Sequence, residues 1–175
     1  MGWILGDIIG DFIGSGVLVG ILAFSMLGAV LGSVVSLMQC LVLRRRVSRA
    51  DWWLLASTAG FAVAGGGGYG AAVVAFDYSE VLEGLGSFAA VLRWTMVVAL
   101  GGAVTGILQW LVLRGQVSRA GWWVLASTVG WGLGMTAGIA YSWPGPMWLI
   151  VTGAVLGAVM GGALVWLLRQ PVPEA

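Results

Sequence analysis

The few charged residues of this chain stand in clusters, and long uncharged stretches separate them. No charge occurs from Phe12 to Leu43, and further uncharged stretches precede Arg114 and Arg169. A helix needs about 20 apolar residues to cross the hydrocarbon core of a bilayer. Hydrophobic residues make up 60% of the chain and charged residues 9%, whereas a soluble domain is about a quarter charged. We therefore expect a multi-pass integral membrane protein.

Six membrane-spanning helices are predicted from these stretches, and the expected fold class is all-α. The residues from Trp3 to Leu43 suit two short spans joined by a turn near Phe24-Ser25-Met26. The other four spans are expected at about 52–76, 95–113, 122–141 and 147–168. The whole chain, 1–175, is expected to form a single transmembrane domain.

The arginines predict the orientation of these spans. Seven of the eight lie in the loops after the second and fourth spans or at the end of the sixth: Arg44, Arg45, Arg46, Arg49, Arg114, Arg119 and Arg169. Loops rich in Lys and Arg stay in the cytoplasm. An even number of spans then puts both termini in the cytoplasm, and we expect the plasma (inner) membrane of a bacterium.

An internal repeat relates residues seventy positions apart. Leu-Val-Leu-Arg occurs at 41–44 and again at 111–114, and Trp-Trp followed by Leu-Ala-Ser-Thr occurs at 52–58 and 122–128. Weaker similarity extends the pattern to both ends of the chain. We interpret the chain as three tandem helix hairpins in one orientation, at approximately 3–46, 52–116 and 122–170, as parallel repeats are arranged.

The sequence Gln-Trp-Leu-Val-Leu-Arg at 109–114, followed by Trp-Trp-Val-Leu-Ala-Ser at 122–127, resembles a group of bacterial multi-pass membrane proteins that carry this repeat. The resemblance covers the second to fifth spans well and the outer spans loosely. It supports the fold and implies no catalytic residue.

Small residues spaced four apart occur in every predicted span, so they share one helix face. Such faces let helix backbones approach closely in lipid. The residues predicted to pack in this way are Gly10, Gly14, Gly32, Gly102, Gly106, Gly130, Gly134, Gly157 and Gly161.

Asp7 and Asp11 lie on one helix face, and two interpretations of them stay open. If the first span begins near Trp3, Asp11 lies near the bilayer midplane, where a carboxylate is costly and marks a proton, cation or partner site. Alternatively, both acids face water at the start of an interfacial amphipathic helix. The repeat favours the first interpretation and the cost of burial favours the second.

Other polar residues recur at matched positions. Gln39 and Gln109 are expected to join helices by hydrogen bonds, with a lipophilic ligand or a pigment magnesium as the alternative partner. The hydroxyls of Ser57, Thr58, Ser127 and Thr128 are expected to bond to carbonyls of their own helices. Lipid headgroups are the expected partners of Arg44, Arg49, Arg114, Arg119 and Arg169.

The composition excludes several kinds of chemistry. The chain has no histidine, no lysine and one cysteine, Cys40, which removes disulfides, zinc sites of Cys and His, Schiff-base lysine and histidine-based triads. A net charge of +1 gives no field for nucleic acid. An enzyme is therefore not expected, and the cofactors left open are a bound lipid, a quinone or a pigment.

Two function classes remain. The first is a structural or accessory subunit that packs against other integral membrane subunits and membrane lipids. The second is a small transporter or substrate-binding component, because the size and topology look like those of the substrate-capturing subunits of energy-coupling-factor vitamin transporters. A polar cavity open to the outer side would favour the second class, and a solid core would favour the first.

Overall fold

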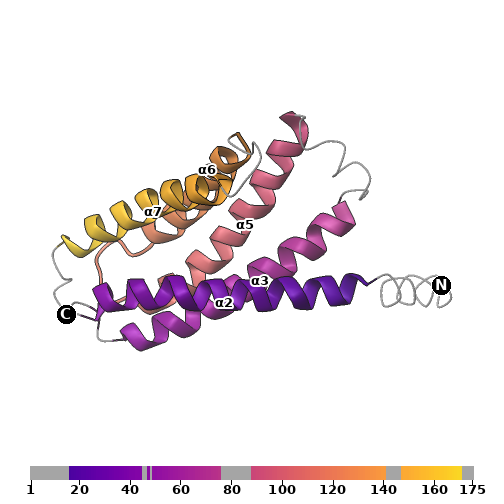
Figure 1. Ribbon diagram of the computed structural model, residues 1–175. Helices are drawn as coiled ribbons and strands as arrows, with labels where there is room; N and C mark the ends of the chain where they lie inside the picture. Colours follow the sequence, from indigo (N-terminus) through magenta and orange to yellow (C-terminus); the bar gives the residue numbers. More distant parts are fainter. Residues whose placement is uncertain (1–15, 45–46, 48, 76–87, 141–146, 171–175) are drawn as a thin grey trace, which may run out of the picture.

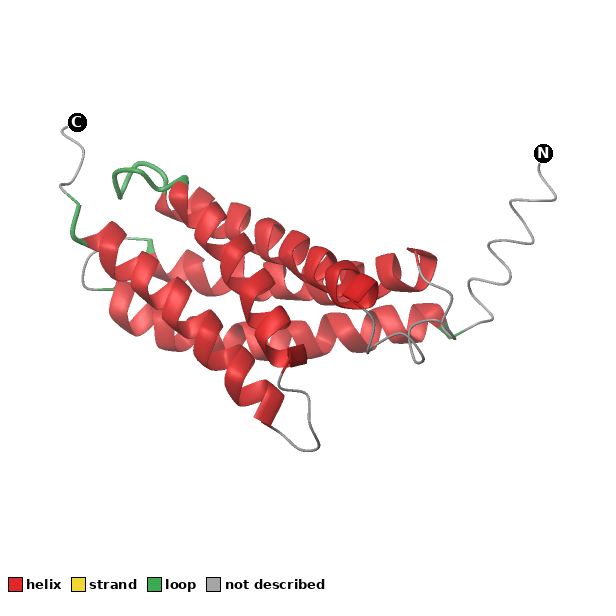
Figure 2. Cartoon of the chain, turned by 90° about the horizontal axis from the view of Figure 1, so that it is seen from above, coloured by secondary structure: helices red, strands yellow, loops and turns green. Residues whose placement is uncertain are grey.

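The computed structural model describes residues 16–44, 47, 49–75, 88–140 and 147–170, which form five α-helices (Figure 1). These are α2 (Val17–Leu43), α3 (Ala50–Ala75), α5 (Phe88–Leu113), α6 (Trp122–Ala140) and α7 (Met147–Leu168). The described residues contain helices and loops but no strand (Figure 2). The predicted all-α class is confirmed. In hydrocarbon, a helix satisfies every backbone N–H and C=O within its own segment.

Four of the helices are long and apolar enough to cross a membrane: α2, the 91–113 part of α5, α6 and α7. The span predicted at 52–76 corresponds to α3, which is not among the four. Its sequence contains a run of four glycines at 65–68, together with serine, threonine and tyrosine. These residues replace aliphatic side chains and lower the mean hydropathy of the helix.

The turn predicted near Phe24-Ser25-Met26 is wrong, because α2 continues without a break from Val17 to Leu43. No proline or charge interrupts this stretch, and the helix gains contacts with α3 along its length. Its 27 residues extend about 40 Å at 1.5 Å per residue, more than a hydrocarbon core of about 30 Å, so a span of this length is accommodated by tilting. Six helices are therefore not supported, and the residues of the first predicted span before Gly16 lie outside the described ones.

Each helix packs against the next one in the sequence, so the order in space is α2, α3, α5, α6, α7. This order puts α2 and α7 at the two edges of the arrangement (Figure 1). The edge helices expose large apolar side chains: Val19 and Met26 of α2 are 70% and 71% exposed. Such surfaces suit contact with lipid tails.

The buried core lies at the end of the molecule where the arginines stand. Its centre consists of residues from both copies of the repeated motif, joined by α7 side chains such as Leu164 and Leu167. The paired positions are Leu43 and Leu113, Val47 and Val117, Ala50 and Ala120, and Trp53 and Trp123. From this end, α2 and α6 diverge toward the opposite end (Figure 1). Among the described residues, the arginine-rich end is therefore closely packed, and α2 and α6 lie farther apart at the other end.

Candidate functional site: repeated polar contacts and an apolar cavity

One hydrogen bond occurs twice, seventy positions apart. The indole Nε1–H of Trp53 donates to Gln39 Oε1 at 3.0 Å, and that of Trp123 donates to Gln109 Oε1 at 2.8 Å. Each bond joins the last part of one helix to the first turn of the helix after the arginine loop. The two predicted glutamines thus hold neighbouring helices together at the arginine-rich end.

Gln109 makes a second contact that Gln39 does not share among the described residues. Its Nε2–H donates to Ser57 Oγ at 2.8 Å, and the side chain is only 1% exposed. Gln109 therefore links α3, α5 and α6, with both ends of its amide bonded to protein atoms.

The predicted bonding of the helix hydroxyls is wrong for three of the four residues. Ser57 accepts from Gln109, Ser127 donates to the backbone oxygen of Gly102 at 2.7 Å, and Thr58 pairs with Ser33 at 3.0 Å. Only Thr128 bonds to its own helix, at Val124 O. Glycine on the facing helix brings another backbone within reach, and a hydroxyl then has a partner outside its own helix.

The glycines of α2 and α5 lie against the next helix. A Cβ on Gly32 would lie 2.7 Å from Phe61 Cβ, and a Cβ on Gly102 would lie 2.8 Å from Trp131 Cβ. Phe61 and Trp131 are also seventy positions apart, so this contact recurs as the glutamine bond does. A Cβ on Gly106 would lie 2.8 Å from Ser127 Cβ.

Gly130 and Gly134 of α6 face α7, but the glycines of α7 have no neighbour among the described residues. A Cβ on Gly130 would lie 3.3 Å from Met160, and one on Gly134 would lie 3.2 Å from the backbone oxygen of Thr152. Within the described part of the chain, nothing lies within 4 Å of a Cβ built at Gly157 or Gly161. The last helix therefore has an open face of small residues.

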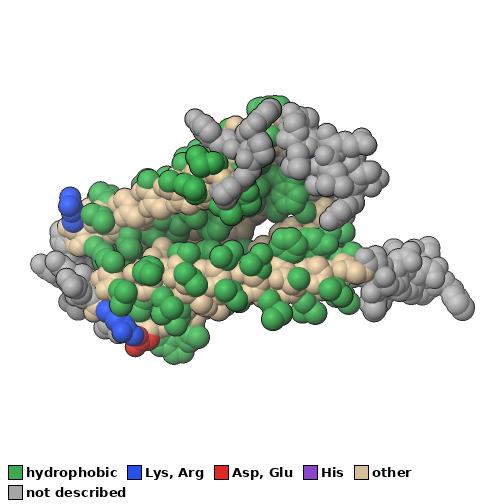
Figure 3. Space-filling model, in the orientation of Figure 1, with side chains coloured by type: hydrophobic (Ala, Val, Ile, Leu, Met, Phe, Trp, Pro, Cys, Tyr) green, Lys and Arg blue, Asp and Glu red, His purple; other side chains and the backbone are tan. Residues whose placement is uncertain are grey.

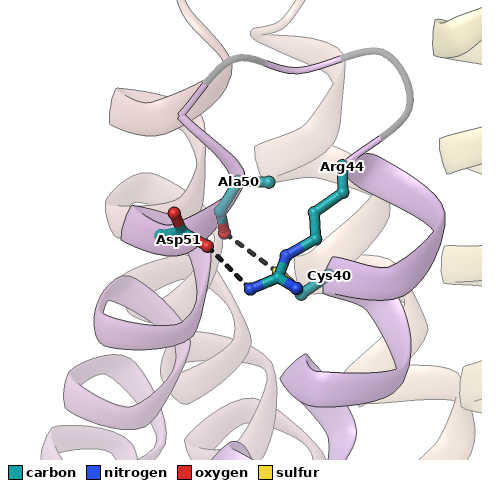
Figure 4. Close-up of polar contacts among 4 residues, drawn as sticks. All are labelled: Cys40, Arg44, Ala50 and Asp51. Carbon is teal, nitrogen blue, oxygen red and sulfur yellow. Dashed lines mark hydrogen bonds and ion pairs between the residues drawn. The ribbon is translucent and has the colours of Figure 1, made fainter.

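The arginines lie at the packed end of the molecule, and the basic side chains visible in Figure 3 are at this end. Arg44 donates to Asp51 at 3.0 Å, and beside this pair the thiol of Cys40 donates to Ala50 O (Figure 4). The hydrogen bond that Arg44 donates to Asp51, and then the negative charge of Asp51, raise the pKa of Arg44 above its usual value. Arg114 lies 5.9 Å from the ring centre of Trp110.

The other arginines at this end form hydrogen bonds through their backbone atoms. The backbone N–H of Arg49 points to Gln116 Oε1 at 3.4 Å, and Arg119 O accepts from Trp122 N–H at 3.0 Å. Arg169 N–H bonds back to the last turn of α7. All five predicted headgroup arginines thus lie at one end of the helices.

A cavity of about 270 Å³ opens between α2, α3, α5 and α6, in the region where Figure 3 shows a hollow above α2. Its lining is rich in aromatic residues and glycine, and none of the lining residues is charged. The aromatic residues are Phe24, Phe61, Tyr69, Trp94 and Trp131. The sequence alone did not predict this cavity, because glycines and aromatic residues occur in closed helix contacts as well as in open ones.

Two orphan polar atoms accompany these helices. Trp131 Nε1, in a residue that lines the cavity, and Thr152 Oγ1 are buried and have no hydrogen-bond partner among the described residues. The described residues hold no group of three or more metal-ligating side chains. Asp7, Asp11, Gly10 and Gly14 lie outside the described residues.

Comparisons with protein-family models, with curated proteins and with solved structures found no match to this chain.

Proposed function

We propose that this chain is a non-catalytic integral membrane subunit that packs against other membrane proteins through the open face of α7. All five described helices cross the membrane in this proposal. The less apolar α3 is included because α2 and α5 pack on it and cover part of its surface. The membrane is the inner membrane of a bacterium. The arginine-rich end and the C-terminus after Arg169 lie in the cytoplasm, in accordance with the positive-inside rule.

The helices form three tandem hairpins: the N-terminal region with α2, α3 with α5, and α6 with α7. Matched contacts within the second and third hairpins support this assignment. A Cβ on Gly60 would touch Thr105, and a Cβ on Gly130 would touch Met160. The two glycines occupy matched positions, each seven residues after a buried tryptophan, Trp53 or Trp123. The residues that they contact are matched as well, because each lies nine residues before an arginine, Arg114 or Arg169. Duplication of one hairpin explains this correspondence.

The single observation that supports the subunit role is the position of Gly157, which no other described helix covers. Gly32, Gly102 and Gly157 each stand twelve residues before an arginine that ends a helix. Gly32 and Gly102 receive the side chain of a neighbouring helix, whereas no described residue lies within 4 Å of a Cβ built at Gly157. Small residues at a helix face allow close packing in lipid. A helix of a partner subunit therefore occupies this face of α7.

Membrane lipids are the other partners in the proposal. Arg44, Arg49, Arg114, Arg119 and Arg169 lie together at the level where α2, α5 and α7 end, the depth expected for phosphate headgroups. Arginine binds phosphate through charge-assisted hydrogen bonds. The proposal contains no catalytic role, because the sequence has no histidine or lysine to serve as base or nucleophile.

Native mass spectrometry after extraction in mild detergent tests the subunit role. We expect the protein in an assembly larger than one chain. Gly157→Ile should break this assembly and leave the monomer folded, because the added side chain meets only the partner. Gly134→Ile is the matched control within the chain and should destabilise the fold itself, since its Cβ meets the backbone of α7. Recovery of the native protein as monomer alone, or an assembly unaffected by Gly157→Ile, would overturn the proposal.

A second candidate function is a small transporter or a substrate-binding component, and the cavity is the observation that favours it. Its walls carry no charge, so any solute bound there is lipophilic, such as a lipid or a quinone, rather than a polar vitamin. A monodisperse monomer that binds a small solute tightly would favour this candidate over the subunit.

A further inference from the structure

The cavity between α2, α3, α5 and α6 extends along one half of the bilayer thickness. On α5 its lining runs from Trp94 to Thr105, and eleven steps of a helix extend about 16 Å. Arg114, at the arginine-rich end, follows Thr105 after nine steps, or about 14 Å. The hydrocarbon core is about 30 Å thick. The cavity therefore begins near the midplane and reaches the headgroup level of the leaflet opposite the arginine-rich end.

Two aromatic side chains with polar tips line the cavity at this headgroup level, which we call its mouth. They are Tyr69 of α3 and Trp94 of α5. Gly68, beside Tyr69, faces Val97 of α5, with 3.6 Å between a built Cβ and the Val97 side chain. The Tyr69 ring stacks on Phe24 of α2, with centroids 4.7 Å apart. Tyrosine and tryptophan are enriched at membrane interfaces, in agreement with the depth derived from α5.

Arg93 lies above the mouth, on the face of α5 that lines the cavity. Val97, Gly101 and Thr105 follow it at intervals of four residues, and all three line the cavity. Residues four apart share one helix face, and helical side chains point back toward the N-terminus of the helix. The Arg93 side chain is therefore directed from the mouth toward the headgroups. Among the described residues, it is the one charged side chain away from the arginine-rich end.

The cavity has the size and lining of a site for a hydrocarbon chain. Its volume is about 270 Å³, and none of its lining residues is charged. Apolar cavities stay dry, because a buried water needs polar partners. Lining glycines such as Gly65 and Gly101 let a chain lie close to the helix backbones. A lipid acyl chain extends from the headgroups toward the midplane, as the cavity does, whereas an uncharged quinone would give Arg93 no anion to bind.

We propose that the cavity binds one acyl chain of an anionic phospholipid from the leaflet opposite the arginine-rich end, with the lipid phosphate at Arg93. The guanidinium has five N–H donors and forms charge-assisted hydrogen bonds with the phosphate oxygens. The chain passes between Tyr69 and Trp94 and ends near Thr105, so it fills the space where α2 and α6 diverge (Figure 1). This site rests on the membrane insertion proposed above and not on a partner subunit at α7.

Native mass spectrometry of the full chain tests the site, after reconstitution into nanodiscs of phosphatidylglycerol and phosphatidylcholine in equal parts. Gly68→Leu should fill the cavity, because Gly68 lines it and a Cβ there meets only Val97. Gly67→Leu is the matched control, since Gly67 is exposed and nothing among the described residues lies within 4 Å of its Cβ. We expect the native chain and Gly67→Leu to retain one phosphatidylglycerol more than Gly68→Leu retains. Lipids at the arginine-rich end remain in all three proteins and cancel in the comparison.

The headgroup contact is tested by Arg93→Gln. This variant should still retain the additional lipid, but the ratio of phosphatidylglycerol to phosphatidylcholine in it should fall about fivefold, the effect of one arginine near an anionic surface. Arg114→Gln is the control at the opposite end and should leave this ratio unchanged.

Circular dichroism and a monodisperse elution profile verify that each variant is folded. Val97→Phe fills the cavity from α5 and should cause the same loss of lipid, which keeps the test decisive if Gly68→Leu does not fold. Equal lipid counts in the native chain and the filled variants would overturn the proposal. A retained lipid without preference for phosphatidylglycerol, or a quinone in its place, would overturn it as well. The count is made on the single chain, so a failure of the subunit role leaves it unaffected.

Discussion

Trp53 and Trp123 contact each other at the arginine-rich end, with ring centroids 5.3 Å apart and ring planes tilted by 60°. Both side chains are fully buried, and each donates its indole N–H to a glutamine. A tilted aromatic pair stabilises by about 0.5–1.5 kcal/mol beyond its buried area. One sequence motif, present twice, thus meets its own copy at the centre of the core, which makes this end the rigid part of the protein.

Gln109→Leu should destabilise the protein more than Gln39→Leu. The first change leaves the Trp123 N–H without an acceptor and breaks the bond to Ser57, whereas the second breaks one bond at a partly exposed site. We expect a loss of about 1–2 kcal/mol for Gln109→Leu, within the range for buried hydrogen bonds. Unfolding of the purified protein in mixed micelles measures the difference, and equal losses for the two variants would contradict it.

Gly102→Ala should lower stability by about 1–3 kcal/mol, the usual cost of overpacking a close contact. The new methyl group would lie 2.9 Å from the backbone oxygen of Ser127, which cannot move without shifting α6. Gly162→Ala is the control, because nothing lies within 4 Å of its Cβ. Thermal unfolding in detergent should show a lower midpoint for the first variant alone. If both midpoints fall equally, the close contact at Gly102 is not the cause of the loss.

Asp51→Asn should leave the thermal midpoint unchanged. The ion pair with Arg44 is exposed on both sides, and exposed ion pairs contribute little because water and salt screen them. Measurements at low and high salt should agree for the native and variant proteins. A clear loss in the variant at low salt alone would show that the pair holds the loop between α2 and α3.

Residues near Glu80, in the loop between the spans predicted at 52–76 and 95–113, should be reachable from outside the cell, and Arg119 from inside. Seven of the eight arginines lie at the end that is expected in the cytoplasm, which motivates this expectation. Glu80→Cys and Arg119→Cys, each in a Cys40→Ala chain, are labelled with a membrane-impermeant maleimide in intact cells and in inverted vesicles. Labelling of both positions from the same side would refute the orientation.

The sequence by itself determined the bounds of the last helix, but not the start of α5, which was predicted at about 95 after Arg93 and begins at Phe88 instead. Met147–Leu168 begins after Pro144-Gly145-Pro146 and stops at Arg169, and its bounds agree with the prediction. The seventy-residue repeat likewise predicted that Gln39 and Gln109 would occupy equivalent positions. These features are local, because a backbone in lipid forms a helix over any apolar stretch of sufficient length.

Only the tertiary structure decided what lies beside each helix. No residue between Val17 and Leu43 tells a continuous helix from a hairpin, and the contact with α3 favours the continuous one. Gly102 and Gly157 have the same sequence neighbourhood, yet one receives Trp131 and the other faces outward. In lipid, apolar side chains are equally stable toward a tail or a neighbouring helix, so hydropathy does not set the rotation of a helix. Packing sets it, and packing depends on the whole arrangement.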